Sequence, residues 1–162
     1  MASTQIDAPP GLPFTEMTRE FDAPRDLVFR AYTDPELLVQ WLGPRKYKMT
    51  LERWEPRDGG LWRYIHSDDE GNSYGFHGVF HGDQTPDGML QTFEFDGAPG
   101  QVSLEKLVLE ERDGKTLLRN HSVYQSVEAR DAMIASGMED GVNDGFARLD
   151  ELLATLRQPV AG

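Results

Sequence analysis

Between residues 46 and 125 the sequence repeats one alternation, in which short β-rich runs are separated by clusters of turn-forming residues. The clusters are RDGG (57–60), SDDEGNS (67–73), GDQTPDG (82–88), DGAPG (96–100) and RDG (112–114). Gly, Pro, Asn and Asp favour the backbone conformations of tight turns, and short turns join antiparallel strands. The pattern therefore predicts an antiparallel meander of six strands. These strands are expected over about 46–56, 61–66, 74–81, 89–95, 101–111 and 115–125.

Helical patterns flank this meander on both sides. An edge strand is predicted over 14–21, and Pro24 and Pro35 then stand where the first turn of a helix accepts proline. On the C-terminal side, apolar residues recur at steps of four and three, which is typical of a helix with one apolar face. They are Met138, Val142, Phe146, Leu149, Leu153 and Leu156. The preceding VEARDAMIAS (127–136) is either a separate helix or the first turns of the same one.

The stretch DPELLVQWLGP (34–44) specifies both ends of a short helix. Pro35 presets φ at the first helical position, and Gly43 followed by Pro44 favours a left-handed cap and a stop. Leu37, Leu38, Trp41 and Leu42 fall on one face. Trp41 is therefore expected to point inward and to border the mouth of any cavity.

The order strand, two short helices, six strands, long helix predicts an α+β fold. A helix with one apolar stripe must cover an apolar surface, here the concave face of a curved seven-stranded antiparallel sheet. Such a sheet seldom closes fully around a helix, so a cavity is expected between them. A single domain is expected over 14–157. A flexible N-terminal tail at 1–13 and a C-terminal tail at 158–162 are expected from their Pro- and Gly-containing sequences.

Composition restricts the partners and the compartment. The chain has 162 residues, of which 38% are hydrophobic, and its net charge of -12 repels nucleic acid and anionic membrane surfaces. It has no cysteine, which excludes disulfides and thiolate chemistry. No segment resembles a signal peptide or a membrane span. We expect a soluble cytoplasmic protein, monomer or homodimer, with no nucleic-acid partner and no membrane insertion.

Three glycines in the last helix are unusual. Gly137, Gly141 and Gly145 lie at i, i+4 and i+8, along one ridge. Each costs about 1 kcal/mol relative to alanine inside a helix. They either let the helix approach the sheet closely, or they leave room for a ligand or let this half of the helix move as a lid.

Five segments carry a resemblance to a known family. They are REFDAPRDLVFRAYTDPELLVQWLGP (19–44), DGGLWRY (58–64), YGFHGVF (74–80), TFEF (92–95) and GMEDGVNDGFARLDELL (137–153). In their order and spacing the chain resembles the SRPBCC (START-like) superfamily, in the branch of activator of heat-shock protein 90 ATPase homologues. The resemblance implies a helix-grip fold, like that of the birch-pollen allergen, with an internal hydrophobic cavity. Function in this superfamily follows the cavity and not the fold.

Strand alternation sorts the candidate site residues by face. Trp62, Tyr64 and His66 share one face of their strand, and two large aromatics make it the face expected to line the cavity. The complete set of expected cavity residues is Trp41, Trp62, Tyr64, His66, Phe80, Glu94, His121, Met138, Val142 and Phe146. His66, His121 and Glu94 could serve as acid or base there. A surface or hydrogen-bonded strand position is the alternative for each.

No metal and no other cofactor is predicted. His77 and His81 are four residues apart, which in a strand places them about 13 Å from each other. Neither an HExxH pattern nor a GxSxG elbow occurs.

The sequence therefore predicts that the domain binds a hydrophobic or aromatic small molecule between the sheet and the last helix, with the ligand unknown. Two alternatives stay open. One is a cyclase- or lyase-like enzyme that uses acid–base residues in the same cavity. The other is a stress-related or co-chaperone-like interaction module.

Overall fold

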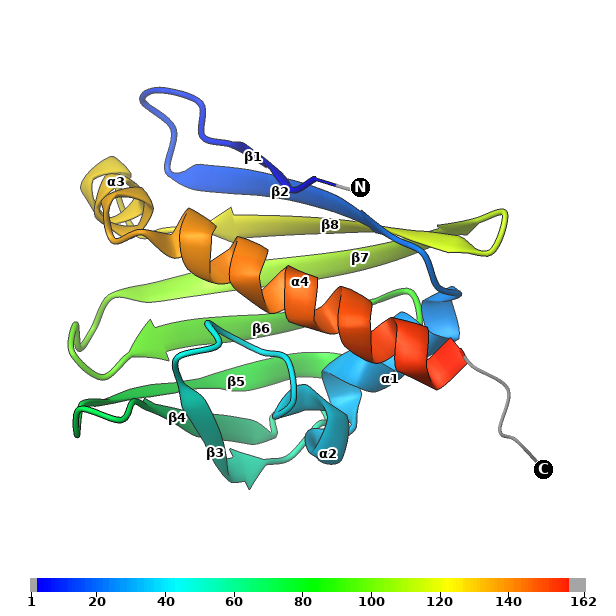
Figure 1. Cartoon of the computed structure of the whole chain (residues 1–162). Helices are drawn as coiled ribbons and strands as arrows, with labels where there is room; N and C mark the ends of the chain where they lie inside the picture. Colours follow the sequence, from blue (N-terminus) through cyan, green and yellow to red (C-terminus); the bar gives the residue numbers. More distant parts are fainter. Residues whose placement is uncertain (1–2, 158–162) are drawn as a thin grey trace.

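A computed structural model describes residues 3–157 of the chain. One sheet of eight antiparallel strands, in the order β1-β2-β8-β7-β6-β5-β4-β3, curves around a long helix, α4 (Figure 1). The strands are β1 Gln5–Asp7, β2 Phe14–Phe21, β3 Lys48–Trp54, β4 Leu61–Ser67, β5 Ser73–Thr85, β6 Gly88–Phe95, β7 Val102–Arg112 and β8 Lys115–Val123. The helices are α1 Arg25–Thr33, α2 Pro35–Leu38, α3 Val127–Ala135 and α4 Met138–Arg157.

The predicted helix-grip fold is confirmed, with one strand more than expected. Gln5–Asp7 pairs antiparallel with β2, in a register that joins Gln5 to Thr18 and Asp7 to Glu16. The expectation of a loose tail over 1–13 is therefore wrong for these residues. Pairing covers the edge that β2 would otherwise expose, and Ile6 packs against the core. The tail predicted over 158–162 lies outside the described residues.

Of the two alternatives for residues 127–136, the structure shows the separate helix, whereas the helix predicted over 34–44 is shorter than expected. Gly137 has φ +86°, a left-handed conformation that separates α3 from α4, so the two are distinct helices. The helix α2 ends at Leu38, earlier than the sequence pattern indicated. The chain continues as turns, with the Leu42 amide donating to the Leu38 carbonyl at 3.1 Å. Gly43, at φ +92°, then redirects the chain toward β3.

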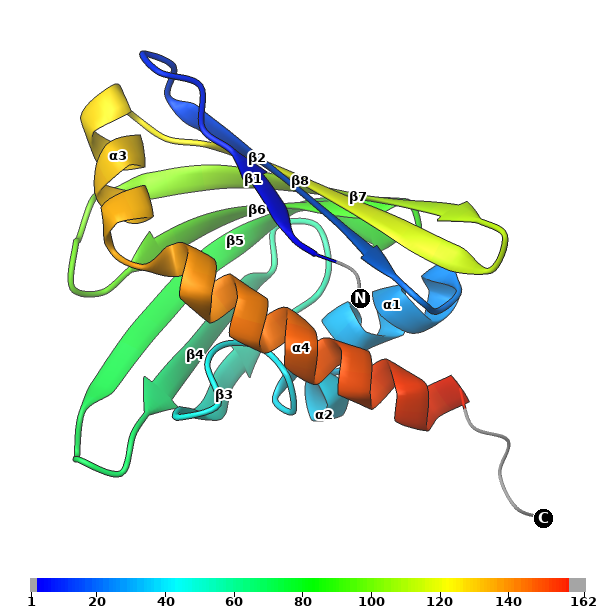
Figure 2. The same ribbon diagram turned by 45° about the horizontal axis from the view of Figure 1, so that its top comes forward.

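The helix α4 crosses the concave face of the sheet diagonally (Figure 2). Its C-terminal half is packed in a solid core, in which Leu149 and Leu153 are 0% and 2% exposed. Phe146 meets Phe21 of β2 edge to face, with ring centroids 5.2 Å apart. The helix α1, which carries buried Val28, lies next to this half of α4 (Figure 1). The N-terminal half of α4 has no such layer beneath it.

Two glycines bring α4 against the loop formed by residues 41–44 and not against the sheet. A Cβ added to Gly145 would lie 3.2 Å from the Gly43 amide nitrogen and 3.4 Å from the Trp41 carbonyl oxygen. A Cβ added to Gly141 would make only ordinary contact with Pro44, at 3.5 Å. The close approach expected from the glycine ridge is thus real, but its partner is a loop.

This geometry predicts different responses to alanine at the two glycines. Gly141→Ala should raise the free energy of unfolding by up to about 1 kcal/mol, because the helix gains propensity without a clash. Gly145→Ala should gain clearly less, because its methyl group presses on backbone atoms that cannot rotate away. Urea unfolding of both variants measures the difference, and equal gains would contradict the tight contact at Gly145.

Candidate functional site

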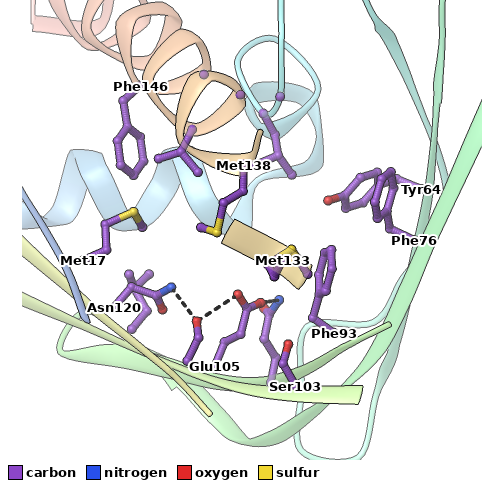
Figure 3. Close-up of a pocket in the computed structure, with 18 of the residues that line it drawn as sticks. Met17, Tyr64, Phe76, Phe93, Ser103, Glu105, Asn120, Met133, Met138 and Phe146 are labelled. Carbon is purple, nitrogen blue, oxygen red and sulfur yellow. Dashed lines mark hydrogen bonds between the residues drawn. The ribbon is translucent and has the colours of Figure 1, made fainter. Parts of the chain in front are cut away.

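A cavity of about 470 Å³ lies between the sheet and the N-terminal half of α4 (Figure 3). Its wall draws residues from the seven strands β2 to β8, from all four helices and from the segment 41–47. Cavities of roughly 300–1,000 Å³ are typical of sites for small molecules. The volume therefore suits a ligand the size of a few fused rings or a medium acyl chain.

One wall of the cavity is aromatic. Trp62, Tyr64 and His66 alternate along β4 and all three face inward. Trp62 and Tyr64 stack with centroids 5.4 Å apart, and Tyr64 contacts Phe76 of β5 at 5.2 Å. Phe93 of β6 continues the surface at 5.6 Å from Phe76. Side chains locked into such stacks form a rigid apolar surface.

The opposite wall comes from the helices. Met138, Val142 and Phe146 of α4 face the cavity, and Met133 of α3 reaches it from the end (Figure 3). Methionine has three rotatable side-chain bonds and adapts to the shape of what it touches. This side of the cavity can therefore repack around occupants of different shape, whereas the β4 side cannot.

Trp41 lies on the cavity wall but not at its mouth. It is only 1% exposed, and its indole Nε1 donates to the Ala31 carbonyl at 2.9 Å. Its ring stacks on Phe146, with centroids 6.4 Å apart, and meets Tyr32 edge to face at 4.8 Å. The prediction that Trp41 borders the mouth is therefore wrong. The residue instead closes the cavity at the side of the solid core.

The cavity continues toward α3. A second pocket adjoins the cavity there and shares Tyr47, His66 and Met133 with it. This pocket is lined further by Tyr74 and Phe95, and Tyr74 is 37% exposed. Aromatic rings thus continue from the interior to the surface along this side.

The floor of the cavity is polar. Gln91 of β6 donates to Glu105 of β7 at 3.5 Å, and the Ser122 hydroxyl of β8 donates to the other carboxylate oxygen at 3.4 Å. Asn120 donates in turn to Ser122 at 3.3 Å. Ser103 of β7 lies on the same surface. Protein surrounds most of the half-buried Glu105 side chain, and the part that stays exposed faces the cavity.

Burial raises the pKa of Glu105, because an enclosed carboxylate loses its hydration. Hydrogen bonds from Ser122, Gln91 and Asn120 act in the opposite direction. Burial also raises the pKa of Tyr32 and Tyr64, and the charge of Glu105 adds to the effect. Both phenols therefore stay neutral at physiological pH.

The floor residues were not predicted as cavity residues, although the alternation along β7 and β8 identifies them. Leu107 and Leu109 are buried on β7, and alternation places Ser103 and Glu105 on the same inward face. On β8, buried Leu118 marks the face that also carries Asn120 and Ser122. A leucine known to be buried fixes the orientation of every other residue in its strand.

Three of the ten predicted cavity residues do not line it. Phe80 is 1% exposed and packs edge to face on Trp54 at 5.2 Å, within the solid core. Glu94 lies on the outer face of β6, where it accepts from the Gly100 amide at 3.1 Å. His121 shares the outer face of β8 with Arg119 and hydrogen-bonds to Glu16 of β2. The other seven predicted residues all lie on the cavity wall.

His66 is the histidine of the cavity wall, and its pKa is strongly lowered. Burial lowers its pKa to about 4, the Leu42 carbonyl acts against this change, and Arg148 adds to it. The ring stacks on Tyr47, with centroids 5.6 Å apart, and meets the tilted ring of Tyr64 at 4.9 Å. His66 is therefore neutral at pH 7 and acts as part of the aromatic wall.

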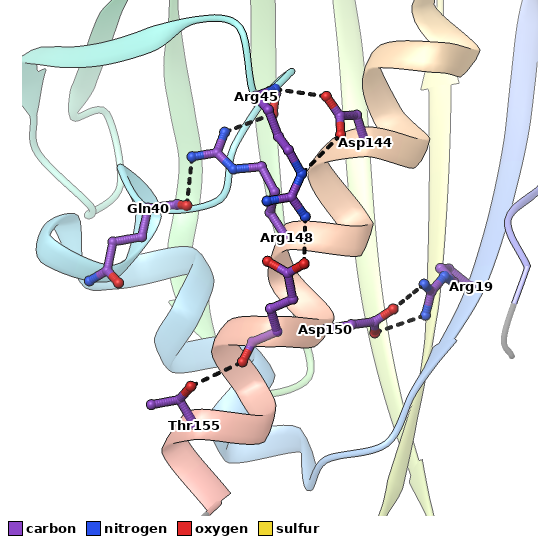
Figure 4. Close-up of polar contacts among 9 residues, drawn as sticks. Arg19, Gln40, Arg45, Asp144, Arg148, Asp150 and Thr155 are labelled. Atoms are coloured by element: carbon purple, nitrogen blue, oxygen red, sulfur yellow. Dashed lines mark hydrogen bonds and ion pairs between the residues drawn. The ribbon is translucent and has the colours of Figure 1, made fainter.

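Ion pairs fix α4 and the adjacent loop above the cavity (Figure 4). Arg19 of β2 is only 6% exposed and binds Asp150 of α4 through two contacts of 3.1 and 2.5 Å. Arg45 reaches Glu151 at 2.6 Å, and Arg148 donates to the Gln40 carbonyl at 2.7 Å. These contacts fix the distance of the loop and the helix from the sheet.

Comparison with known proteins identifies the family. A sequence model described as "Activator of Hsp90 ATPase homolog 1-like protein" matches residues 22–154. The chain belongs to this family. The membership predicted from the five quoted segments is confirmed, and the fold of the family is compatible, in general terms, with small-molecule binding or a co-chaperone-like role.

Solved structures agree with the family. A crystal structure of a protein from Rhodobacter sphaeroides is 32% identical, covers 94% of this chain and 99% of its own, and superposes with a TM-score of 0.86. An NMR structure of a protein from Arthrobacter aurescens is 23% identical over 96% of this chain and 92% of its own, with a TM-score of 0.84. Protein Ms6760 from Mycobacterium smegmatis is 22% identical over 94% and 97%, also with a TM-score of 0.84. The last two, at this identity, show the shared fold alone.

A search of curated proteins gave no match. Within residues 3–157, no helix combines the length and the hydropathy that a membrane crossing requires.

The ion pair of Arg19 predicts an asymmetry between two neighbouring acidic residues of α4. Asp150→Ala should lower the free energy of unfolding by about 2–3 kcal/mol, because it leaves a buried guanidinium without its counter-ion. Glu151→Ala removes an exposed pair with Arg45 and should cost less than about 1 kcal/mol. Chemical denaturation of the two variants makes the comparison, and losses of equal size would show that the Arg19 pair does not hold α4.

The lowered pKa of His66 predicts a pH dependence of stability. The unfolded imidazole takes up a proton below its ordinary pKa of 6.5, whereas the folded one resists protonation until about pH 4. The stability that His66 contributes is therefore complete above pH 6.5 and is lost as the pH falls toward 4, with a slope of at most about 1.4 kcal/mol per pH unit. His66→Asn should flatten this slope in urea unfolding between these limits. His81→Asn, at an exposed position, is the matched control and should leave the slope unchanged.

Proposed function

We propose that this protein binds a hydrophobic or aromatic small molecule in the cavity between the sheet and α4. The observation that supports the proposal is an interior space of about 470 Å³ whose wall is mostly apolar outside its polar floor. An unfilled apolar space costs stability, because its lining forgoes the contacts of a close-packed core. A domain that otherwise packs Leu149 and Leu153 so tightly gains from such a space only when a ligand occupies it.

The proposed binding residues divide by role. Trp62, Tyr64 and His66 supply a rigid surface on which a flat ligand can stack. Met138 and Val142 supply the adaptable side above it. Trp41 and Phe146 limit how deep the ligand can extend, because the solid core begins behind them.

The arrangement of titratable groups favours binding over acid–base catalysis. An acid–base pair would need two such groups to converge on one point of the cavity. Glu105 is on β7 and His66 is on β4, three strands apart in the sheet. At about 4.8 Å per strand, this separation is about 14 Å along the sheet.

An interaction module is also less well supported. The large exposed apolar side chains are Leu12, Tyr74, Leu104, Val123 and Ile134. Leu104 and Val123 are partners across β7 and β8 and form a patch of two residues. Docking surfaces of stable partners expose larger continuous apolar areas.

Titration with N-phenyl-1-naphthylamine, an uncharged fluorescent probe, tests the proposal. Val142→Trp should weaken probe binding by about tenfold or more, because the larger ring fills space that the probe needs. Asn143→Trp places the same side chain at the next, exposed position of α4 and should leave binding unchanged. Weak binding to the unmodified protein, or equal binding to both variants, would count against a ligand in this cavity.

A further inference from the structure

Glu105 is the one carboxylate among the residues that line the cavity. The lining contains no lysine, arginine or aspartate, and its histidine, His66, is neutral at pH 7. The other titratable groups around Glu105 are phenols: Tyr32 of α1, Tyr64 of β4 and Tyr124 after β8. Within the described lining, therefore, no group can balance the charge of this carboxylate. Asp150, by comparison, is paired with Arg19.

The hydrogen bonds around Glu105 all run toward it. Gln91 donates to one carboxylate oxygen and Ser122 donates to the other. Asn120 donates to the Ser122 oxygen, which leaves the Ser122 hydroxyl hydrogen to point at Glu105. The surroundings are thus arranged around an acceptor. The distances of 3.4 and 3.5 Å are at the long end for hydrogen bonds, so these partners compensate the charge only weakly.

Acceptors also remain unused on this floor. A carboxylate offers about four acceptor positions, and three neighbouring side chains, Ser122, Gln91 and Asn120, supply donors to this one. The amide groups of Gln91 and Asn120 use their NH2 ends in the bonds described, which leaves their carbonyl oxygens as further acceptors. The Ser103 hydroxyl adds another on the same surface. The floor therefore combines a carboxylate that has no positively charged partner in the lining with several acceptors that are still open to a donor.

We infer that the cavity selects apolar molecules that carry a protonated amine. The ammonium group would lie on the polar floor, with Glu105 as its counter-ion, and the aliphatic or aromatic body would lie between β4 and α4. An ammonium group brings the positive charge that this floor lacks, and its three donors match the acceptors that remain open there. The inference rests on the proposed function, since it names the chemical class of the ligand in the same cavity.

The charge of the whole protein acts in the same direction. A net charge of -12 attracts cations toward the surface and repels anions such as fatty-acid carboxylates. In the free protein the pKa of Glu105 is raised by burial, and a bound ammonium group would lower it. Amine binding should therefore weaken as the pH falls and Glu105 takes up a proton.

Three probes that share a naphthalene ring and differ in their polar group test the inference: 2-naphthylmethylamine, 2-naphthylmethanol and 2-naphthoic acid. Isothermal titration calorimetry at about pH 8 should show that the amine binds about tenfold more tightly than the alcohol, because a charge-assisted contact replaces a neutral one. The acid should bind most weakly. Lowering the pH should weaken the amine and leave the alcohol unchanged.

Glu105→Gln is the decisive variant, because it removes the charge and keeps the size of the side chain. It should abolish the preference for the amine over the alcohol while alcohol binding persists. Glu110→Gln, on the outer face of the same strand, is the matched control and should retain the preference. Binding of the alcohol by Glu105→Gln also shows that the variant is folded.

The outcomes separate this inference from the proposed function. If the alcohol and N-phenyl-1-naphthylamine bind but the amine has no advantage, or if its advantage survives in Glu105→Gln, the inference is overturned and the cavity remains a binding site. If the acid binds best, the inference is likewise overturned. If none of the probes binds, both proposals fail together.

Discussion

The contact between α4 and the loop formed by residues 41–44 decides where the interior of this protein is solid and where it is hollow. Gly145 allows the helix to touch the loop backbone, and Arg45 and Arg148 secure that contact from outside. On one side of the contact the leucines of α4 reach the sheet and complete a core. On the other side the loop and the helix together span the sheet without filling the space beneath them.

The strands beneath α4 change from packed core to cavity floor at the same contact. Along β7, Leu107 and Leu109 belong to the core, whereas Ser103 and Glu105, on the same face, lie on the cavity floor. Polar side chains are tolerated there because the cavity gives them room for partners other than packed carbon. One strand thus contributes to the packed core at one end and to the cavity floor at the other.

Local chemistry explains which features the sequence made predictable. Gly, Pro and Asp at particular positions determine the boundaries of β2 and the turns of the meander, and the sequence predicted both. The strand β1 has three residues, too few for alternation to be visible. His121 was assigned inward because the parity of β8 had no reference, although buried Leu118 provides one. Glu105 was not predicted because the parity of β7 likewise had no reference, although buried Leu107 and Leu109 provide one. The cavity depends on a contact between residues about 100 positions apart, which no short pattern contains.

The left-handed turn at Gly137 makes α3 a separate unit whose sequence can vary without disturbing the core. Its residues Ala129, Ala132 and Met133 line only the outer pocket and the adjoining end of the cavity. Substitutions there would alter the length and width of the space open to a ligand, while the packing around Leu149 and Leu153 stayed as it is. A protein built in this way can acquire new specificity through one nine-residue helix, and α3 is accordingly the element to diversify in a designed library of binders.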